Sequence, residues 1–184
     1  MRQTATEYRV SRVAIVGLAL AAKAAAAQVP SAAVLSAEID AKGAKEVVNR
    51  LNSTPPGADG QNEWNRVTHE MWLGRAAYIE LAPKLAPGTD AGTSEDLGIC
   101  LAHALPLAPI TVLRATDLKD VPALGVSRVC GVPFIEDTVE DVPAYIRVAQ
   151  EKVGAVTVPG LQDVKAACLK QLDAAAKHMS STAK

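Results

Sequence analysis

The sequence predicts an all-α protein: a single-domain bundle of about six to eight helices around a central apolar helix near residues 90–105, with one disulfide. Apolar residues recur at steps of three and four over most of the chain, whereas the strict alternation typical of strands is absent. Residues 97–105 are apolar on nearly every side, so other helices must surround them. Aromatic residues make up only 3% of the chain, so Ala, Val and Leu must fill the core.

The N-terminal segment has the three parts of a secretory signal peptide. Three arginines precede the apolar residues 13–22, and a run of alanines then ends at Ala27. The export machinery and its peptidase read this order, so we expect residues 1–27 to be a signal peptide that is cut after Ala27. The alternative is a retained membrane anchor, which would need about 20 apolar residues. This run stops at Lys23.

Cleavage would leave a mildly acidic chain. It removes four of the 19 basic residues and one of the 20 acidic ones, which leaves 15 against 19 and a formal charge of −4. A chain with this charge and no basic stripe attracts phosphate backbones weakly, so we expect no nucleic-acid partner. We expect a linker over residues 28–35, one helical domain over 36–179 and a disordered tail over 180–184, with no membrane span after cleavage.

The first helices follow from spacing and from turn residues. Helical spacing of apolar residues predicts a helix over 36–51, which Gly43 weakens, and a second helix over 61–73. The loop between them holds the glycosylation sequon Asn52-Ser53-Thr54, which we expect to remain unmodified. A short helix over 75–81 should stop at Pro83, because proline breaks a helix interior.

The central helix has clear signals at both ends. Asp90, Thr93 or Ser94 could cap its first turn, and Pro106 ends it. Pro109 suits the first turn of a further short helix that returns antiparallel.

The second half of the domain is predicted to end in two longer helices. A short helix fits residues 125–130. A helix over 140–156 turns Arg147 and Gln150 outward. The last helix has inward positions at steps of three and four: Leu161, Val164, Cys168, Leu172, Ala175 and Met179.

Three short strings carry a resemblance to a known group. Residues 85–92 read LAPGTDAG, residues 101–106 read LAHALP, and residues 130–136 read CGVPFIE, with Cys168 further on. Over about half of the mature chain this resembles small exported helical proteins of proteobacteria. The resemblance implies an exported helical domain with a bridge between Cys130 and Cys168, and it supplies no activity.

The cysteines themselves predict one bridge and one free thiol. Export would bring three cysteines, an odd number, into an oxidising compartment. A disulfide that closes a loop of 38 residues (168 minus 130) or of 30 residues (130 minus 100) would raise the free energy of unfolding by about 4 kcal/mol in either case. Environment favours the pair Cys130 and Cys168, since Cys100 lies in the buried central helix. A Cys100–Cys130 bridge and the absence of any bridge are the alternatives.

Two pairs of residues, each with one histidine, are candidates for a catalytic or metal site. Cys100 and His103 lie one helical turn apart, as a nucleophile and its base or as two soft metal ligands. Apolar surroundings raise a thiol pKa, so we expect His103 to be a satisfied histidine in or near the core. His69 and Glu70 begin a zinc-protease motif that fails, because Leu73 stands at the second histidine position. We therefore predict no catalytic residue, no cofactor and no metal site.

Two acidic clusters have a structural and a functional interpretation. The cluster of Asp90, Glu95 and Asp96, with Gly92 and Ser94, could hold calcium but lacks EF-hand spacing, and helix capping explains it. The second cluster lies beside Phe134 and Ile135 and is either a solvated loop or a docking surface for a basic partner. Its members are Glu136, Asp137, Glu140 and Asp141.

The functional hypothesis is therefore broad. We expect a periplasmic or secreted helical protein that binds or scaffolds an envelope component, with a protein partner in the cell envelope, and not an enzyme. The alternative is a hydrolase or metal-dependent enzyme whose site is assembled from His69, Glu70, His103 and the acids near Asp90. A small-molecule carrier would need an apolar cavity, which an alanine-rich core would not readily leave.

Overall fold

The structure is a computed structural model that describes residues 29–119, 121–134 and 139–182. These residues form α-helices and short 3-10 helices and contain no strand beyond an isolated bridge between Asp117 and Gly125. The predicted all-α, single-domain fold is confirmed. The expected signal peptide, residues 1–27, lies outside the described residues.

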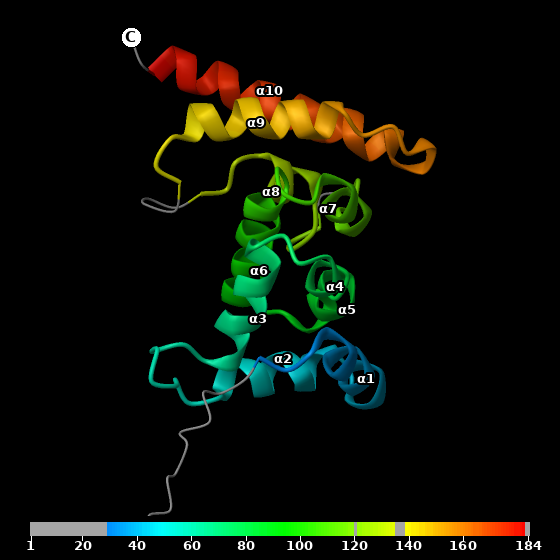
Figure 1. Ribbon diagram of the computed structural model, residues 1–184, viewed down its shortest axis with the longest axis vertical. Helices are drawn as coiled ribbons and strands as arrows, with labels where there is room; N and C mark the ends of the chain where they lie inside the picture. The colour runs from blue at the N-terminus through cyan, green and yellow to red at the C-terminus, as the bar shows by residue number, and fades with distance from the viewer. Residues whose placement is uncertain (1–28, 120, 135–138, 183–184) are drawn as a thin grey trace, which may run out of the picture.

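The helices stack along the long axis of the molecule (Figure 1). Helices α1 and α2 lie at one end, α3 to α8 form the middle, and α9 and α10 form an antiparallel hairpin at the other end. The helices have these bounds: α1 Ala32–Lys42, α2 Ala44–Ser53, α3 Glu63–Trp72, α4 Ala76–Ile79, α5 Ala82–Leu85, η1 Ala86–Gly88, α6 Ala91–Ala104, α7 Pro109–Ala115, α8 Val126–Cys130, α9 Val142–Gly154, η2 Pro159–Leu161 and α10 Gln162–Thr182.

One glycine and one proline divide the first half differently from the sequence prediction. The helix expected over 36–51 is two helices, because Gly43 has φ +86 and turns the chain between α1 and α2. The short helix expected to stop at Pro83 ends earlier, and Pro83 instead lies in the first turn of α5. A first-turn proline loses no intrahelical hydrogen bond, which makes this placement favourable.

The central helix is α6, as predicted. Asp90 caps it: the Thr93 N–H donates to the Asp90 carboxylate over 2.9 Å, and the Thr93 hydroxyl accepts from the Asp90 N–H over 2.9 Å. All of residues 97–105 are buried except His103, which is half-buried. Helices α3, α7 and α8 pack around α6 and provide the surrounding layer that its apolar surface requires.

A disulfide fixes the terminal hairpin to the middle of the molecule. Cys130 at the end of α8 is bonded to Cys168 in α10, with the two Cα atoms 5.2 Å apart. This is the pairing that the sequence favoured. Cys100 is free and buried, also as expected. Helix α10 continues to Thr182, past the residue at which the disordered tail was expected to begin.

A row of aromatic rings makes a second connection between the hairpin and α6. The His103 ring lies between Trp72 of α3 and Phe134, and Phe134 in turn meets Tyr145 of α9 edge to face. The Tyr145 hydroxyl donates to the Ala102 carbonyl over 2.7 Å. The disulfide and the row of aromatic rings therefore hold the hairpin to the middle of the molecule at two places.

Candidate functional site

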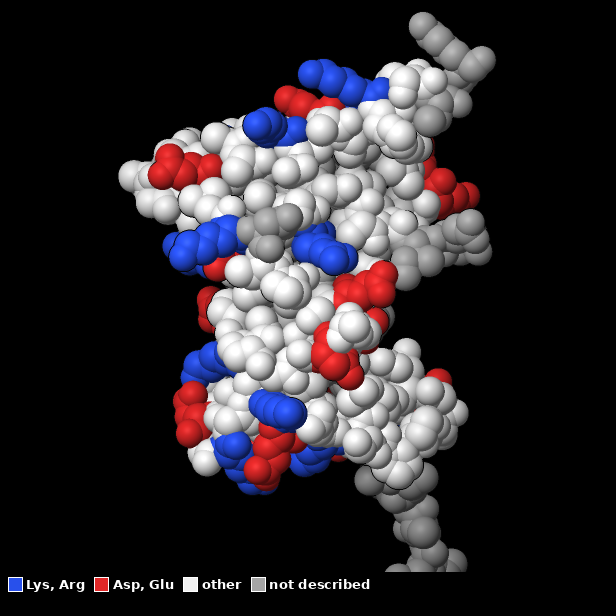
Figure 2. Space-filling model, turned by 180° about the vertical axis from the view of Figure 1, so that it is seen from behind, with Lys and Arg blue, Asp and Glu red and all other residues white. Residues whose placement is uncertain are grey.

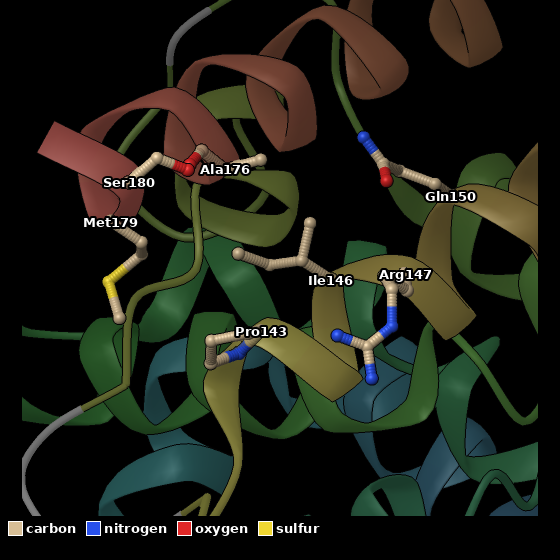
Figure 3. A pocket seen from close by; sticks show the side chains of 7 residues that line it. All are labelled: Pro143, Ile146, Arg147, Gln150, Ala176, Met179 and Ser180. Atoms are coloured by element: carbon tan, nitrogen blue, oxygen red, sulfur yellow. The ribbon is translucent and has the colours of Figure 1, made fainter. Parts of the chain in front are cut away.

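An apolar hollow lies at the open end of the α9–α10 hairpin (Figure 3). It is a half-open groove with a volume of about 400 Å³. One wall comes from the first two turns of α9 and the other from the last turns of α10. Seven side chains line it, and we call it the hairpin groove: Pro143, Ile146, Arg147, Gln150, Ala176, Met179 and Ser180.

Helical spacing explains why these positions share one surface. The other lining positions of α9 lie three, four and seven residues after Pro143, at 146, 147 and 150, so all four fall on one side of the helix. Pro143 occupies the first turn, and Asp141 caps the helix by accepting from the Ala144 N–H over 2.8 Å. Local sequence thus fixes where α9 begins and which side chains face the groove.

The lining of the groove is mostly apolar. Ile146 forms its floor and is only 2% exposed, so its side chain belongs both to the core and to the groove. Met179 is 37% exposed at the edge, and Figure 3 shows its thioether extending from α10 toward the side on which Pro143 of α9 lies. A flexible methionine beside rigid proline and isoleucine can adapt to the shape of an apolar ligand.

The polar side chains of the groove differ in what they can offer a ligand. The Gln150 amide donates to the Asp173 carboxylate over 2.6 Å, and the Ser180 hydroxyl donates to the Ala176 carbonyl over 2.9 Å. Arg147 makes no ion pair or hydrogen bond with any described residue. The groove therefore combines an apolar floor with one uncompensated positive charge.

The sequence predicts where single residues of this groove point, but it does not predict that they assemble into a groove. Arg147 is exposed, as predicted, whereas Gln150 is half-buried, and Met179, predicted to lie on the inward stripe of the last helix, is 37% exposed. Met179 is exposed because α10 runs past the first turn of α9, so no described helix covers its last turns. The available signal was an apolar stripe that continues to the end of a helix with no partner helix left to bury it.

Three other hollows of the described residues have a more polar lining, and charge is mixed on the surface. On the side opposite to Figure 1, acidic and basic side chains are interspersed (Figure 2). That face carries no continuous basic strip of the kind that follows a nucleic-acid backbone.

His69 and Glu70 do not form a site with each other. His69 is exposed and lines a small separate pocket of about 170 Å³, together with Asp96 and Cys100. Glu70 faces Arg75, with 3.7 Å between carboxylate and guanidinium. The Asp96 carboxylate accepts from the indole N–H of Trp64 over 2.9 Å, which gives it a structural role.

Cys100 and His103 are also unsuited to nucleophilic chemistry. Burial raises the pKa of the Cys100 thiol, and the thiol donates to the Leu97 carbonyl over 3.2 Å. Burial lowers the pKa of His103 to about 4, so the ring is neutral at neutral pH. Its Nε2 atom is buried and has no hydrogen-bond partner among the described residues. The prediction of a histidine with its hydrogen bonds satisfied is therefore wrong.

One residue of each acidic cluster, Asp90 in the first and Asp141 in the second, caps a helix. Hydrogen bonds from Thr93 lower the pKa of Asp90, as expected for the cap of α6. Asp141 caps α9 in the same way. Across the described ranges, no three His, Cys, Asp or Glu side chains are placed to hold a metal ion. Glu136 and Asp137 of the second cluster lie outside these ranges.

Comparison with known proteins gives no relative. No protein-family model, no curated protein and no solved structure matches the chain. Over the residues that the structure describes, none of the helices has the length and apolar character needed to cross a bilayer.

Proposed function

We propose that this is an exported helical protein that works by non-covalent binding of a component of the cell envelope, and that the hairpin groove is its binding surface. The observation that carries the proposal is the half-open apolar groove with the unpaired Arg147 at its edge. Binding sites combine a mainly apolar surface with a few polar groups that orient the ligand, and the hairpin groove has this composition.

Two features support the location. The basic, apolar and small-residue order of residues 1–27 is that of a signal peptide. The bond between Cys130 and Cys168 is of the kind that persists in oxidising compartments, such as a periplasm or the cell exterior. N-terminal sequencing of the protein from an envelope or medium fraction tests this location. We expect the chain to begin at Gln28, and an uncut chain in the cytosol would contradict it.

The enzyme alternative has less support. It required His69, Glu70, His103 and the acids near Asp90 to meet in one cleft. His69 lines one pocket, Asp90 lines another, and Glu70 faces Arg75. His103 is stacked between aromatic rings. Asp96, an acid near Asp90, lines the same small pocket as His69, but its carboxylate accepts from the Trp64 indole N–H, and among the described residues no hydrogen bond or ion pair joins it to His69.

Site-directed photo-crosslinking in living cells tests the binding function. A photo-reactive phenylalanine derivative is placed at Ser180, in the lining of the groove, and as a matched control at Gly160, where an added Cβ atom meets nothing within 4 Å. We expect a discrete crosslinked product from position 180 and none from position 160.

A second variant shows whether the product depends on the groove. Ala176→Phe adds a large ring to the groove wall, so it should block a ligand and abolish the crosslink at position 180. A product that survives this change, or that forms equally from position 160, would contradict a role for the groove.

A further inference from the structure

We infer that the hairpin groove takes an amphipathic helix of a partner protein, and that an acidic residue of this helix pairs with Arg147. This inference rests on the proposed function, because it names the chemistry of the ligand for the same groove. Three properties of the groove support it: its length along α9, its openness to solvent and the position of its charge.

The length of the groove matches two turns of a helix. Its α9 wall extends from Pro143 to Gln150, seven residues apart, which at 1.5 Å per residue is about 10 Å. Side chains at i, i+3, i+4 and i+7 form the ridge that one helix presents to another. A third helix lying along the hairpin would fill the space between the ridges of α9 and α10.

The openness of the groove favours a helix over an acyl chain. A half-open groove covers only part of a ligand, and small-molecule sites usually bury most of the ligand's surface. A bound acyl chain would leave apolar surface in water on its outer side. An amphipathic helix presents apolar residues to the groove and polar residues to solvent, so it suits a surface of this shape.

The charge of the groove selects the sign of the partner. Arg147 has no described ion-pair partner, and it lies beside the apolar floor formed by Ile146. A carboxylate that approaches there can form a charge-assisted hydrogen bond in a partly dry setting, where such bonds are stronger than in water. A lysine in the same register would be repelled, which makes the groove selective as well as attractive.

The same charge disfavours a second copy of this chain as the occupant. A symmetric dimer pairs the same patch on both copies. In that arrangement Arg147 of each copy would approach a groove in which the one charged lining residue is another Arg147. Like charges brought together at a small apolar contact oppose association.

A panel of fluorescein-labelled peptides tests the inference. Each peptide is about 14 residues long, which is four helical turns, and carries leucines at i, i+3, i+4 and i+7. In one set a glutamate is moved around the polar edge of the helix, and in a matched set a lysine takes each of its positions. Binding to the mature, disulfide-bonded protein is measured by fluorescence anisotropy. We expect the best glutamate peptide to bind about tenfold more tightly than its lysine counterpart.

Variants of the protein then assign the preference to Arg147. Arg147→Glu should reverse it, so that the lysine peptide binds more tightly. The matched control Lys170→Glu changes an exposed charge on α10 outside the groove and should leave the preference unchanged. Ala176→Phe should weaken binding of all peptides. Far-ultraviolet circular dichroism and thermal melting verify that each variant folds.

The possible outcomes separate this inference from the proposed function. Equal binding of both peptide sets, or a preference that Arg147→Glu does not change, would overturn the inference. Binding of dodecanoate that Ala176→Phe abolishes, with no peptide bound, would reject a helical partner and leave the binding function standing. Self-association that requires an open groove would assign it to a second copy. Absence of all binding, together with no crosslink at position 180, would reject both proposals.

Discussion

The imidazole ring of His103 stacks on the indole ring of Trp72, with ring centroids 3.3 Å apart and planes inclined by 15°. Phe134 lies on the imidazole at 4.6 Å, and Tyr145 meets Phe134 at 4.7 Å. The row crosses from α3 through α6 to α9, so it connects the middle of the molecule to the hairpin that carries the groove. Its one titratable ring near neutral pH is His103, and protonation of that ring would disturb the connection.

The first prediction is that acid destabilises the protein through His103. Its pKa is about 4 in the folded chain against 6.5 as the ordinary value, so the unfolded chain binds the proton first. The contribution of the neutral His103 ring to the free energy of unfolding is therefore fully present above pH 6.5 and is lost as the pH falls toward 4. The full shift corresponds to about 3 kcal/mol, but partial exposure and attraction of a cation to the Trp72 face reduce this to about 1–2 kcal/mol.

Urea unfolding between pH 4.5 and 7.5 measures this effect. His103→Phe keeps an aromatic ring in the row and removes the proton, so its free energy of unfolding should fall less in acid than that of the original protein. Acidic residues titrate in both proteins, and the difference between the two curves isolates His103. Parallel curves across this range would mean that His103 does not contribute.

The second prediction concerns the disulfide. Replacing Cys130 and Cys168 together by alanine should lower the free energy of unfolding by about 4 kcal/mol, because the bond closes a loop over a sequence separation of 38 residues in the unfolded chain. The original protein unfolded in the presence of a thiol reductant serves as the control and should show a similar loss. A change below about 1 kcal/mol would contradict this account of how the hairpin is held.

The third prediction concerns Arg50, which joins the first three helices. Its guanidinium donates to Glu38 of α1 over 2.7 and 2.9 Å and to Glu63 of α3 over 2.6 Å. The hydrogen bond from Arg50 lowers the pKa of Glu38. Arg50→Met should therefore lower the free energy of unfolding by about 1 kcal/mol, a modest value because the side chain is 36% exposed.

Salt provides the check on the electrostatic origin of this effect. Raising the ionic strength screens exposed charges, so the loss caused by Arg50→Met should shrink in high salt. Lys152→Met removes a single exposed pair with Glu151 and should change stability by a few tenths of a kcal/mol at most. If the two variants were equally stable, the connection between α1, α2 and α3 would have to lie elsewhere.

The fourth prediction concerns the close approach of η1 to α2. A Cβ atom at Gly88 would overlap the backbone carbon of Ala44 and lie 2.6 Å from the backbone nitrogen of Lys45, so one helix would have to move. Gly88→Ala should lower the free energy of unfolding by about 2 kcal/mol. Gly160→Ala is the matched control, since an added Cβ there meets nothing within 4 Å, and thermal melting of the two variants compares them directly.

The sequence by itself determined the helical class, the buried central helix and the favoured cysteine pair. Residues 97–105 are so uniformly apolar that any water-exposed placement would be unfavourable, and their burial required no knowledge of the neighbours. The cap at Asp90 could also be predicted, because a capping residue and its hydrogen-bond donor lie within one turn of each other. Each of these features depends on contacts between residues close in the sequence, or on burial alone.

Only the tertiary structure decided the rest. The hairpin groove exists because α10 extends past the first turn of α9, which brings Met179 opposite Pro143 across a separation of 36 positions (179 minus 143). The stacking of His103 on Trp72 and the close approach of Gly88 to α2 likewise join distant segments. Periodicity shows which side of a helix is apolar, but it does not show how far one helix extends beyond another. An exposed apolar groove therefore becomes visible only when the helices are assembled.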